Sequence, residues 1–230
     1  WHLWSPVTEK AEDIEACRKM TFDAGEEPIG GTSWWLDPIC LGRYPDTTGY
    51  SYGAYIPDTT AEDMKIISQP IDFIGMNVYQ TYRGKAGENG TCITIPNDPG
   101  YARTNAEWSV TPEALYWGPK FYEERYHKKL YITENGLSNQ DWIFLDGQVH
   151  DLQRIDFLHR YLYQLKRAVE EGISVEGYFH WTLTDNFEWT SGYNNRFGLV
   201  YTDFKNQNRI IKDSGKWYRQ VIETNGEIIK

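Results

Sequence analysis

The stretch that decides the fold is residues 129–136, which read Lys-Leu-Tyr-Ile-Thr-Glu-Asn-Gly. Its first part is a short apolar run with a β-branched end, which is typical of a buried parallel strand. The run stops at a carboxylate, Glu134, and the following Asn135-Gly136 favours a turn. In a β/α barrel the active site lies at the C-terminal ends of the strands, so Glu134 is well placed for chemistry. The alternative is that Glu134 only caps the strand and pairs with a nearby Lys or Arg.

The residues on either side of this stretch repeat a pattern of strand, loop and helix. We expect parallel strands over 71–79, 129–134 and 175–180, and helices over 5–20, 60–68, 111–127, 151–171 and 214–224. We expect a long loop over 81–110 and a small ribbon over 198–204. This alternation predicts parallel βα units. Three strands cannot close a barrel, because a closed barrel with a filled interior needs about eight. Residues 1–230 are therefore predicted to form a single partial domain.

The composition narrows the function. The 230 residues carry a net charge of −10, which argues against nucleic acid or an anionic membrane as a partner. Aromatic residues make up 16% of the chain, which suits a site that stacks on sugar rings, although many of them are expected to fill the core. No apolar run is long enough to span a bilayer, and no signal peptide starts at residue 1. The odd number of widely spaced cysteines, Cys17, Cys40 and Cys92, predicts neither a disulfide framework nor a metal site and favours the cytoplasm.

Three motifs occur in one order along the chain. They are residues 129–136, residues 181–189 (Trp-Thr-Leu-Thr-Asp-Asn-Phe-Glu-Trp) and residues 196–201 (Arg-Phe-Gly-Leu-Val-Tyr). Together they resemble family 1 glycoside hydrolases, the β-glucosidase family, and the resemblance runs from about Trp4 to about Ile222. It implies a (β/α)8 TIM barrel, of which this chain is the C-terminal part, from about strand 5 or 6 to strand 8. It also implies a retaining β-glycosidase that needs no cofactor and no metal ion.

Retaining glycosidases use two carboxyl groups, one as nucleophile and one as acid and base, about 5 Å apart. By resemblance, Glu134 is the nucleophile that forms the glycosyl–enzyme intermediate. A nucleophilic carboxylate has to stay ionised and therefore needs hydrogen-bond donors around it. Tyr79, at the end of the preceding strand, matches the family's tyrosine that donates to the nucleophile. The alternative for Tyr79 is a tyrosine packed in the core.

The resemblance also implies a set of sugar-binding residues. Glu188 would accept hydrogen bonds from two hydroxyls of the non-reducing sugar, and the tryptophans would supply flat apolar faces. The full set is Asn77, Trp108, Trp181, Glu188, Trp189 and Phe197. Relatives that act on 6-phosphosugars have Ser in place of Glu188. Because an acid at that point repels a phosphate dianion, we expect neutral glucosides or galactosides as substrates.

One part of the family pattern is missing. The acid/base glutamate of the family lies in a Thr-x-Asn-Glu-Pro motif, and no Asn-Glu-Pro occurs here. Glu27-Pro28 follows a polar turn and not a strand, so it is not a substitute. We therefore expect half of a β-glucosidase, inactive without an N-terminal half as its partner. Two other functions stay open: a non-catalytic sugar-binding or assembly module, and a stand-alone hydrolase in which Glu188 or Asp185 is the acid.

Overall fold

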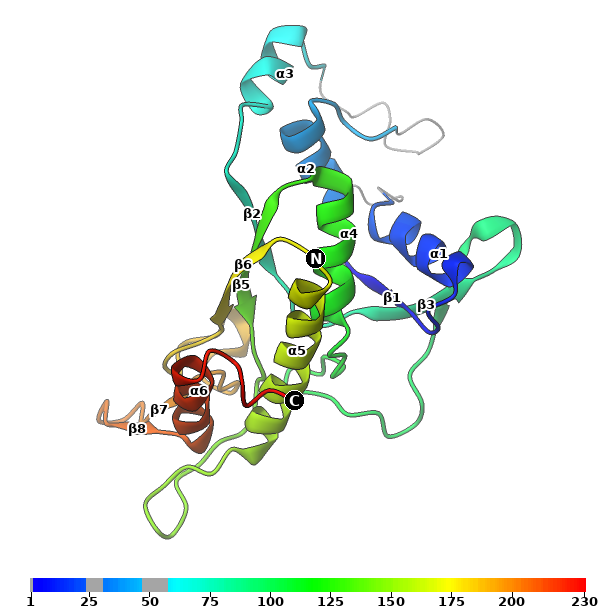
Figure 1. The fold of residues 1–230 in the computed structure, drawn as a ribbon. Coiled ribbons are helices and arrows are strands. Elements are labelled where there is room, and N and C mark those ends of the chain that lie inside the picture. Colours follow the sequence, from blue (N-terminus) through cyan, green and yellow to red (C-terminus); the bar gives the residue numbers. More distant parts are fainter. Residues whose placement is uncertain (1, 24–30, 47–57) are drawn as a thin grey trace.

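The computed structural model describes residues 2–23, 31–46 and 58–230. Its central sheet has three parallel strands in the order β2-β5-β6, which are β2 (Phe73–Asn77), β5 (Lys129–Asn135) and β6 (Val175–His180). Helix α4 (Ala114–Tyr126) connects β2 to β5, and helix α5 (Leu152–Glu170) connects β5 to β6 (Figure 1). The predicted strands and crossover helices are therefore present, and they form consecutive parallel βα units.

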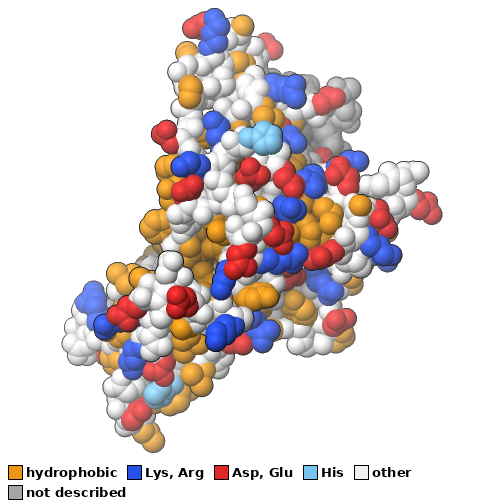
Figure 2. Space-filling view, viewed as in Figure 1, with side chains coloured by type: hydrophobic (Ala, Val, Ile, Leu, Met, Phe, Trp, Pro, Cys, Tyr) orange, Lys and Arg blue, Asp and Glu red, His pale blue; other side chains and the backbone are white. Residues whose placement is uncertain are grey.

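In the part of the chain that the structure describes, the sheet is covered on one face only. Ile74, Met76, Leu130 and Ile132 point toward α4 and α5 and are at most 4% exposed. On the opposite face Phe73 is 50% exposed, and Phe179 on β6 is also largely open, with hydrophobic side chains gathered over β5 and β6 at the left of Figure 2. The predicted strand at residues 130–133 is thus present, but only the side chains on one of its faces are buried, so the prediction of burial is wrong for the other face. Parallel sheets are normally covered on both faces, so this open face is unusual.

The N-terminal part forms a second, smaller sheet. It consists of β1 (Trp4–Pro6), β3 (Tyr82–Ala86) and β4 (Cys92–Ile95), with β1 parallel to β3 and β3 antiparallel to β4. A short turn of 3₁₀ helix, η3 (Glu88–Gly90), joins β3 to β4. The prediction of a continuous loop over 81–110 is therefore wrong for residues 82–95. The backbone of β3 pairs with a strand almost eighty residues earlier, and local sequence carries no signal for such a pairing.

Within residues 2–23, 31–46 and 58–72, three α-helices precede β2, namely α1 (Ala11–Thr21), α2 (Thr32–Leu41) and α3 (Ala61–Ile67). Helix α3, expected over 60–68, begins with a capping box between Thr60 and Asp63. Helix α1 begins after Lys10 without a side-chain cap, because a lysine side chain has no acceptor; the Thr8 hydroxyl donates to the Asp13 carboxylate at 2.6 Å and accepts the Lys10 backbone N–H at 3.3 Å. Helix α2 was not expected, since Pro38 lies inside it. The pair Glu27-Pro28 lies outside the described residues.

The C-terminal part closes one end of the sheet. It contains η4 (Trp189–Ser191), a ribbon of β7 (Val200–Thr202) and β8 (Arg209–Ile211), and helix α6 (Asp213–Glu223). Asp151 precedes α5 but does not cap it: its carboxylate accepts the backbone N–H of Ser214, at the start of α6, at 2.8 Å. One connected hydrophobic core extends from Leu3 to Ile229. None of the helices in the described ranges is long and apolar enough to cross a membrane.

Candidate active site

Glu134 and Tyr79 meet at the C-terminal ends of β5 and β2. The two strands are paired in parallel, and a shift of register between Met76 and Asn77 brings Asn77 opposite Glu134. The Tyr79 hydroxyl donates to Oε2 of Glu134 at 2.6 Å. Burial, and then the hydrogen bond to Glu134, raises the pKa of Tyr79 well above its ordinary value, so this hydroxyl keeps its proton and acts as a donor. No Lys or Arg within the described residues pairs with Glu134, so the strand-capping alternative lacks its cationic partner.

A group of three aromatic rings lies beside this pair. The ring of Tyr79 is 4.8 Å from Trp108 and 6.2 Å from Phe197, and the latter two rings are 6.0 Å apart. Trp108 lies in the loop after β4, whereas Phe197 lies in the long segment between β6 and the ribbon strand β7. His180 at the end of β6 supports Phe197: its Nε2 lies 3.2 Å from the Phe197 carbonyl oxygen. Desolvation lowers the pKa of His180 to about 3, so the ring is neutral and Nε2 carries the proton that this bond needs.

Asn77 lies on the open face of the sheet, next to Glu134. Its side chain is exposed, and its Oδ1 accepts the Thr133 hydroxyl at 2.7 Å. This contact leaves the two amide N–H groups of Asn77 free to donate toward the open face. Four of the predicted site residues, Asn77, Tyr79, Trp108 and Phe197, therefore surround the end of β5 that carries Glu134.

The loop after β6 brings a second carboxylate to the same end of the sheet. The indole N–H of Trp181 donates to Oε2 of Glu188 at 3.4 Å, so these two predicted residues are brought together. The negative charge of Glu188 also interacts with Tyr79 and helps to raise the pKa of its phenol. Trp189 is placed differently: it is 81% exposed and makes no ring contact with the other described aromatic residues. Its predicted sugar contact therefore stays a prediction.

A buried ionic cluster holds the loop after β6 in place. The Asp185 carboxylate accepts from Lys212 Nζ at 2.8 Å and from Arg196 at 2.6 Å, and it also accepts the backbone N–H of Gly198. Since the Asp185 side chain is completely buried and fully bonded, it has no free oxygen for a substrate, which argues against its use as a catalytic acid. The cluster holds three cations and three anions, which are Arg154, Arg196, Lys212, Asp141, Asp151 and Asp185.

The electrostatics of the cluster follow from its burial. Burial acts to raise the pKa of Asp141, but the charges of Arg154 and Lys212 outweigh it and hold the pKa below its ordinary value. Burial, and then the charge of Arg154, lowers the pKa of Lys212, although Asp185 and Asp141 act in the opposite direction. Asp185 is named in the sequence analysis only as a possible catalytic acid. The remaining members come from four separate segments, so only the fold reveals that they meet.

The pair Asn135-Gly136 is explained by packing and not only by a turn. Asn135 is fully buried; its amide donates to the Val78 carbonyl at 2.8 Å and it accepts the Tyr178 hydroxyl at 2.9 Å. At Gly136 an added Cβ would lie 1.8 Å from the Trp181 carbonyl oxygen, so no other residue fits without moving the backbone. These contacts hold the ends of β2, β5 and β6 in fixed positions around Glu134. Sequence reasoning did not identify Tyr178 as part of this support.

The described residues contain no group of three His, Cys, Asp or Glu side chains that could hold a metal ion. What they do contain is a carboxylate bonded to a tyrosine, beside aromatic rings, at the carboxyl ends of parallel strands. This defines the chain as a β/α protein with the Glu134 carboxylate at the position where barrels of this class carry their active sites.

Comparison with known proteins identifies the family. Residues 2–227 match the sequence profile of Glycosyl hydrolase family 1, and the chain belongs to that family. It is 40% identical over 224 residues to a 1,4-beta-D-glucan glucohydrolase of Thermotoga neapolitana, with 97% of this chain and 49% of that protein aligned. It is 39% identical to Beta-glucosidase A of Acetivibrio thermocellus, over 96% of this chain and 49% of that protein.

The fold agrees with this assignment. The structure of a beta-glucosidase from Thermotoga maritima in complex with glucoimidazole superposes with a TM-score of 0.81 and 38% identity, over 98% of this chain and 50% of that chain. The chain therefore spans about half the length of the relatives that it matches.

Proposed function

We propose that this chain is the nucleophile-bearing, C-terminal half of the barrel of a retaining β-glucosidase. The observation that carries the proposal is the 2.6 Å hydrogen bond from the Tyr79 hydroxyl to a Glu134 carboxylate that has no cationic partner in the described ranges. An ion-paired carboxylate would be held for stability, whereas one that is bonded by a neutral donor is free to attack an anomeric carbon. Glu134 would then form the glycosyl–enzyme intermediate, and Tyr79 would orient it.

The sugar is proposed to lie over the open face of the sheet, beside Glu134. Asn77 and Glu188 would bond the sugar hydroxyls, since each has polar atoms free at this end of the sheet. Trp181 orients Glu188 through its indole N–H. The rings of Trp108, Phe197 and Trp189 would supply the apolar contacts. A carboxylate at Glu188 favours neutral glucosides or galactosides over 6-phosphosugars, because two negative groups in contact repel strongly.

The acid/base group is proposed to come from an N-terminal half. The central sheet has three strands, and both β2 and β6 present an edge that is unpaired within the described residues. Unpaired edges are destabilising in a free sheet, and so are the exposed side chains of Phe73 and Phe179. Further strands that closed a barrel of about eight strands would cover both. The chain contains no Asn-Glu-Pro sequence, so the second carboxyl group would have to lie on those additional strands.

Residues 1–230 are proposed to be one partial domain, since a single hydrophobic core connects Leu3 to Ile229. The three cysteines are all free thiols, which supports the proposal of a cytoplasmic location. A second candidate is a sugar-binding or assembly module without catalysis, which the missing Asn-Glu-Pro sequence favours.

Covalent labelling separates the two candidates. A 2-fluoro glucoside with a dinitrophenolate leaving group needs no proton donor, so it should label Glu134 in a mixture of this chain with the N-terminal half of a Thermotoga relative. Glu134→Gln should abolish the adduct. Glu176→Gln is the matched control, because Glu176 is a carboxylate on β6 that pairs with Lys129 at 3.5 Å, and this variant should label normally. A binding module would give no adduct and would bind glucose equally well with Gln at position 134.

Turnover tests the dependence on a partner half. We expect the isolated chain to hydrolyse an aryl β-glucoside at least about a thousandfold more slowly than the mixture, because both the general acid and much of the sugar pocket are absent. Equal rates would show that the chain supplies its own acid and would refute the half-barrel proposal.

A further inference from the structure

Two of the three cysteines, far apart in the sequence, meet in the fold. Cys17 lies on α1 and Cys92 begins β4, and their sulfur atoms are 3.9 Å apart. One thiol donates a weak hydrogen bond to the other at this distance. Cys40, on α2, makes no such contact with either of them. The sequence predicted no pairing of these cysteines, since residues 17 and 92 are separated by 75 positions.

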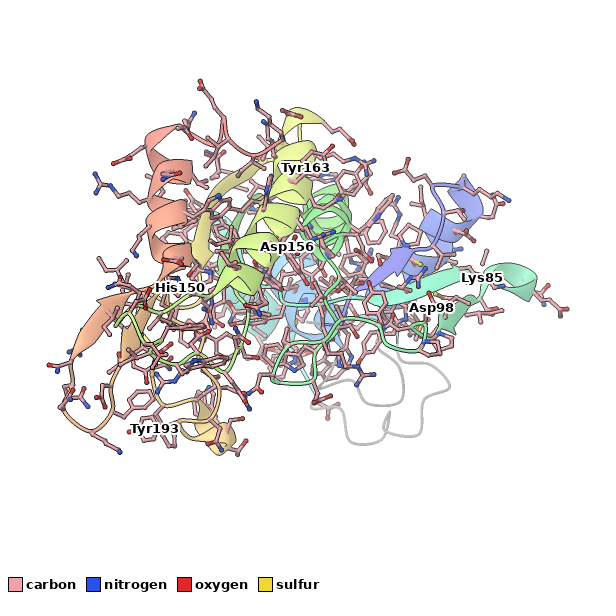
Figure 3. The ribbon with its side chains drawn as sticks, turned by 90° about the horizontal axis from the view of Figure 1, so that it is seen from below. Lys85, Asp98, His150, Asp156, Tyr163 and Tyr193 are labelled. Carbon is pink, nitrogen blue, oxygen red and sulfur yellow. The ribbon has the colours of Figure 1, made fainter. Side chains whose placement is uncertain are left out.

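The fold provides a space that holds both sulfur atoms. Gly84 on β3 lies beneath the pair, and a Cβ added there would lie 2.7 Å from each sulfur. A residue with a side chain would push the two sulfurs away, so the glycine is what allows them to approach each other. Both cysteines are carried by regular elements that pack together: α1 contacts both β3 and β4, and β3 pairs with β4. Figure 3 shows the ribbon that carries Lys85 lying beside α1.

The two thiols differ in their access to solvent. Cys17 is completely buried. Cys92 is only partly buried and lines a cavity of about 410 Å³, together with Lys19, Met20 and Thr91. A small oxidant can therefore reach Cys92 first, while Cys17 lies directly behind it.

We propose that Cys17 and Cys92 are an oxidative modification site, at which a hydroperoxide converts the two thiols into an intramolecular disulfide. The Cys92 thiolate attacks hydrogen peroxide, forms a sulfenic acid and releases hydroxide, which takes up the proton that the thiol lost, giving water. The Cys17 sulfur then displaces the sulfenic oxygen, forms the S–S bond and releases a second water. Overall, two thiols are oxidised by two electrons and one hydrogen peroxide is reduced to two waters. The sulfurs need to approach by only about 1.8 Å to reach bonding distance, which side-chain rotation can provide.

The surroundings determine how fast this reaction runs. Burial raises the pKa of both thiols, and the Asp13 carboxylate on α1, the charged group that acts on both, raises them further. Since the thiolate is the nucleophile, the reaction is slow near neutral pH and should accelerate by roughly tenfold per pH unit up to the pKa. The site is thus protected from adventitious oxidation and responds to sustained exposure to peroxide.

The proposal is tested on the reduced 230-residue chain. After treatment with hydrogen peroxide at about pH 8, digestion without reductant and mass spectrometry should find the peptides of Cys17 and Cys92 joined and lighter by two hydrogen atoms. Reduction with dithiothreitol should separate them. Because the bond closes a loop of about 75 residues, the oxidised chain should melt at a Tm higher by about 5–10 °C.

Two variants complete the experiment. Cys40→Ser should form the same link, because Cys40 makes no contact with the pair. Cys92→Ser should show neither the link nor the rise in Tm, and its circular dichroism should match that of the reduced parent. The proposal is overturned if the folded parent chain keeps both thiols after oxidation, or if Cys40 is recovered in disulfides as often as Cys17. Both of these outcomes are measured on the unsubstituted chain, so the test remains valid even if a variant fails to fold.

Discussion

Replacing Lys212 with methionine should test how strongly the buried ionic cluster stabilises the fold. Lys212 is completely buried, and its Nζ lies 2.6 Å from Asp141 and 2.8 Å from Asp185. Methionine has a similar length and no charge, so the variant keeps most of the packing and removes one of three cations. Three carboxylates then face two arginines, and Asp141 and Asp185 each lose a charged hydrogen bond.

The magnitude follows from this imbalance. Removing one partner of a buried ion pair reduces the free energy of unfolding by about 3–5 kcal/mol, because the remaining charge stays buried without compensation. Burial also penalises the charged form of Lys212 itself, as its lowered pKa indicates, and losing that penalty offsets part of the effect. We therefore expect the lower end of the range, about 3 kcal/mol, a large share of the 5–15 kcal/mol that is typical of a domain.

Urea unfolding, followed by tryptophan fluorescence and far-ultraviolet circular dichroism, measures this difference. The matched control is Lys216→Met in the first turn of α6, the helix that Lys212 precedes; this lysine is 51% exposed and pairs with Asp213 at 3.1 Å. This exposed pair should contribute at most about 1 kcal/mol. Adding Asp141→Asn to Lys212→Met should restore part of the lost stability by removing the excess negative charge. If Lys212→Met unfolds within about 1 kcal/mol of the control, the charge balance of the cluster does not govern stability and the reasoning is wrong.

Three further predictions concern single contacts. Tyr79→Phe removes one hydrogen bond to the Glu134 carboxylate and should slow fluoro-sugar labelling about 10- to 100-fold, and an unchanged rate would argue against an orienting role. His150, labelled in Figure 3, has its pKa raised by hydrogen bonds to Asp213 and a second aspartate. The stabilising effect of the protonated His150 should therefore be complete below pH about 6.5 and disappear as the pH rises through its raised pKa. The difference in Tm between the parent chain and His150→Gln should then shrink as the pH rises. Parallel curves of Tm against pH for the two proteins would contradict this. Gly136→Ala places a Cβ against a backbone carbonyl and should lower the stability by at least about 2 kcal/mol, visible as an early urea midpoint.

Local sequence patterns were sufficient to predict the strands and helices that depend mainly on neighbouring residues. The strand at 175–180 and the helices after residues 60 and 151 follow from hydrophobic periodicity and capping residues, and the structure places them within a few residues of the expected bounds. The helix at Thr32–Leu41 was missed because proline in a helix interior is unfavourable, and its tertiary contacts override that preference. One such contact is the bond from Arg125 on α4 to Asp37 at 2.5 Å.

The sequence by itself determined the parallel βα units, the family resemblance and the placing of Glu134 at the end of a strand, because these depend on short runs and their order. Only the tertiary structure decided that Tyr79 donates to that carboxylate, that Asp185 is enclosed by Lys212 and Arg196, and that Cys17 lies against Cys92. Each of these contacts joins segments that are distant in the chain, apart from Asp185 and Arg196. A hydrogen bond or an ion pair depends on distances of a few ångström, and such distances between remote residues are set by how the strands and helices pack.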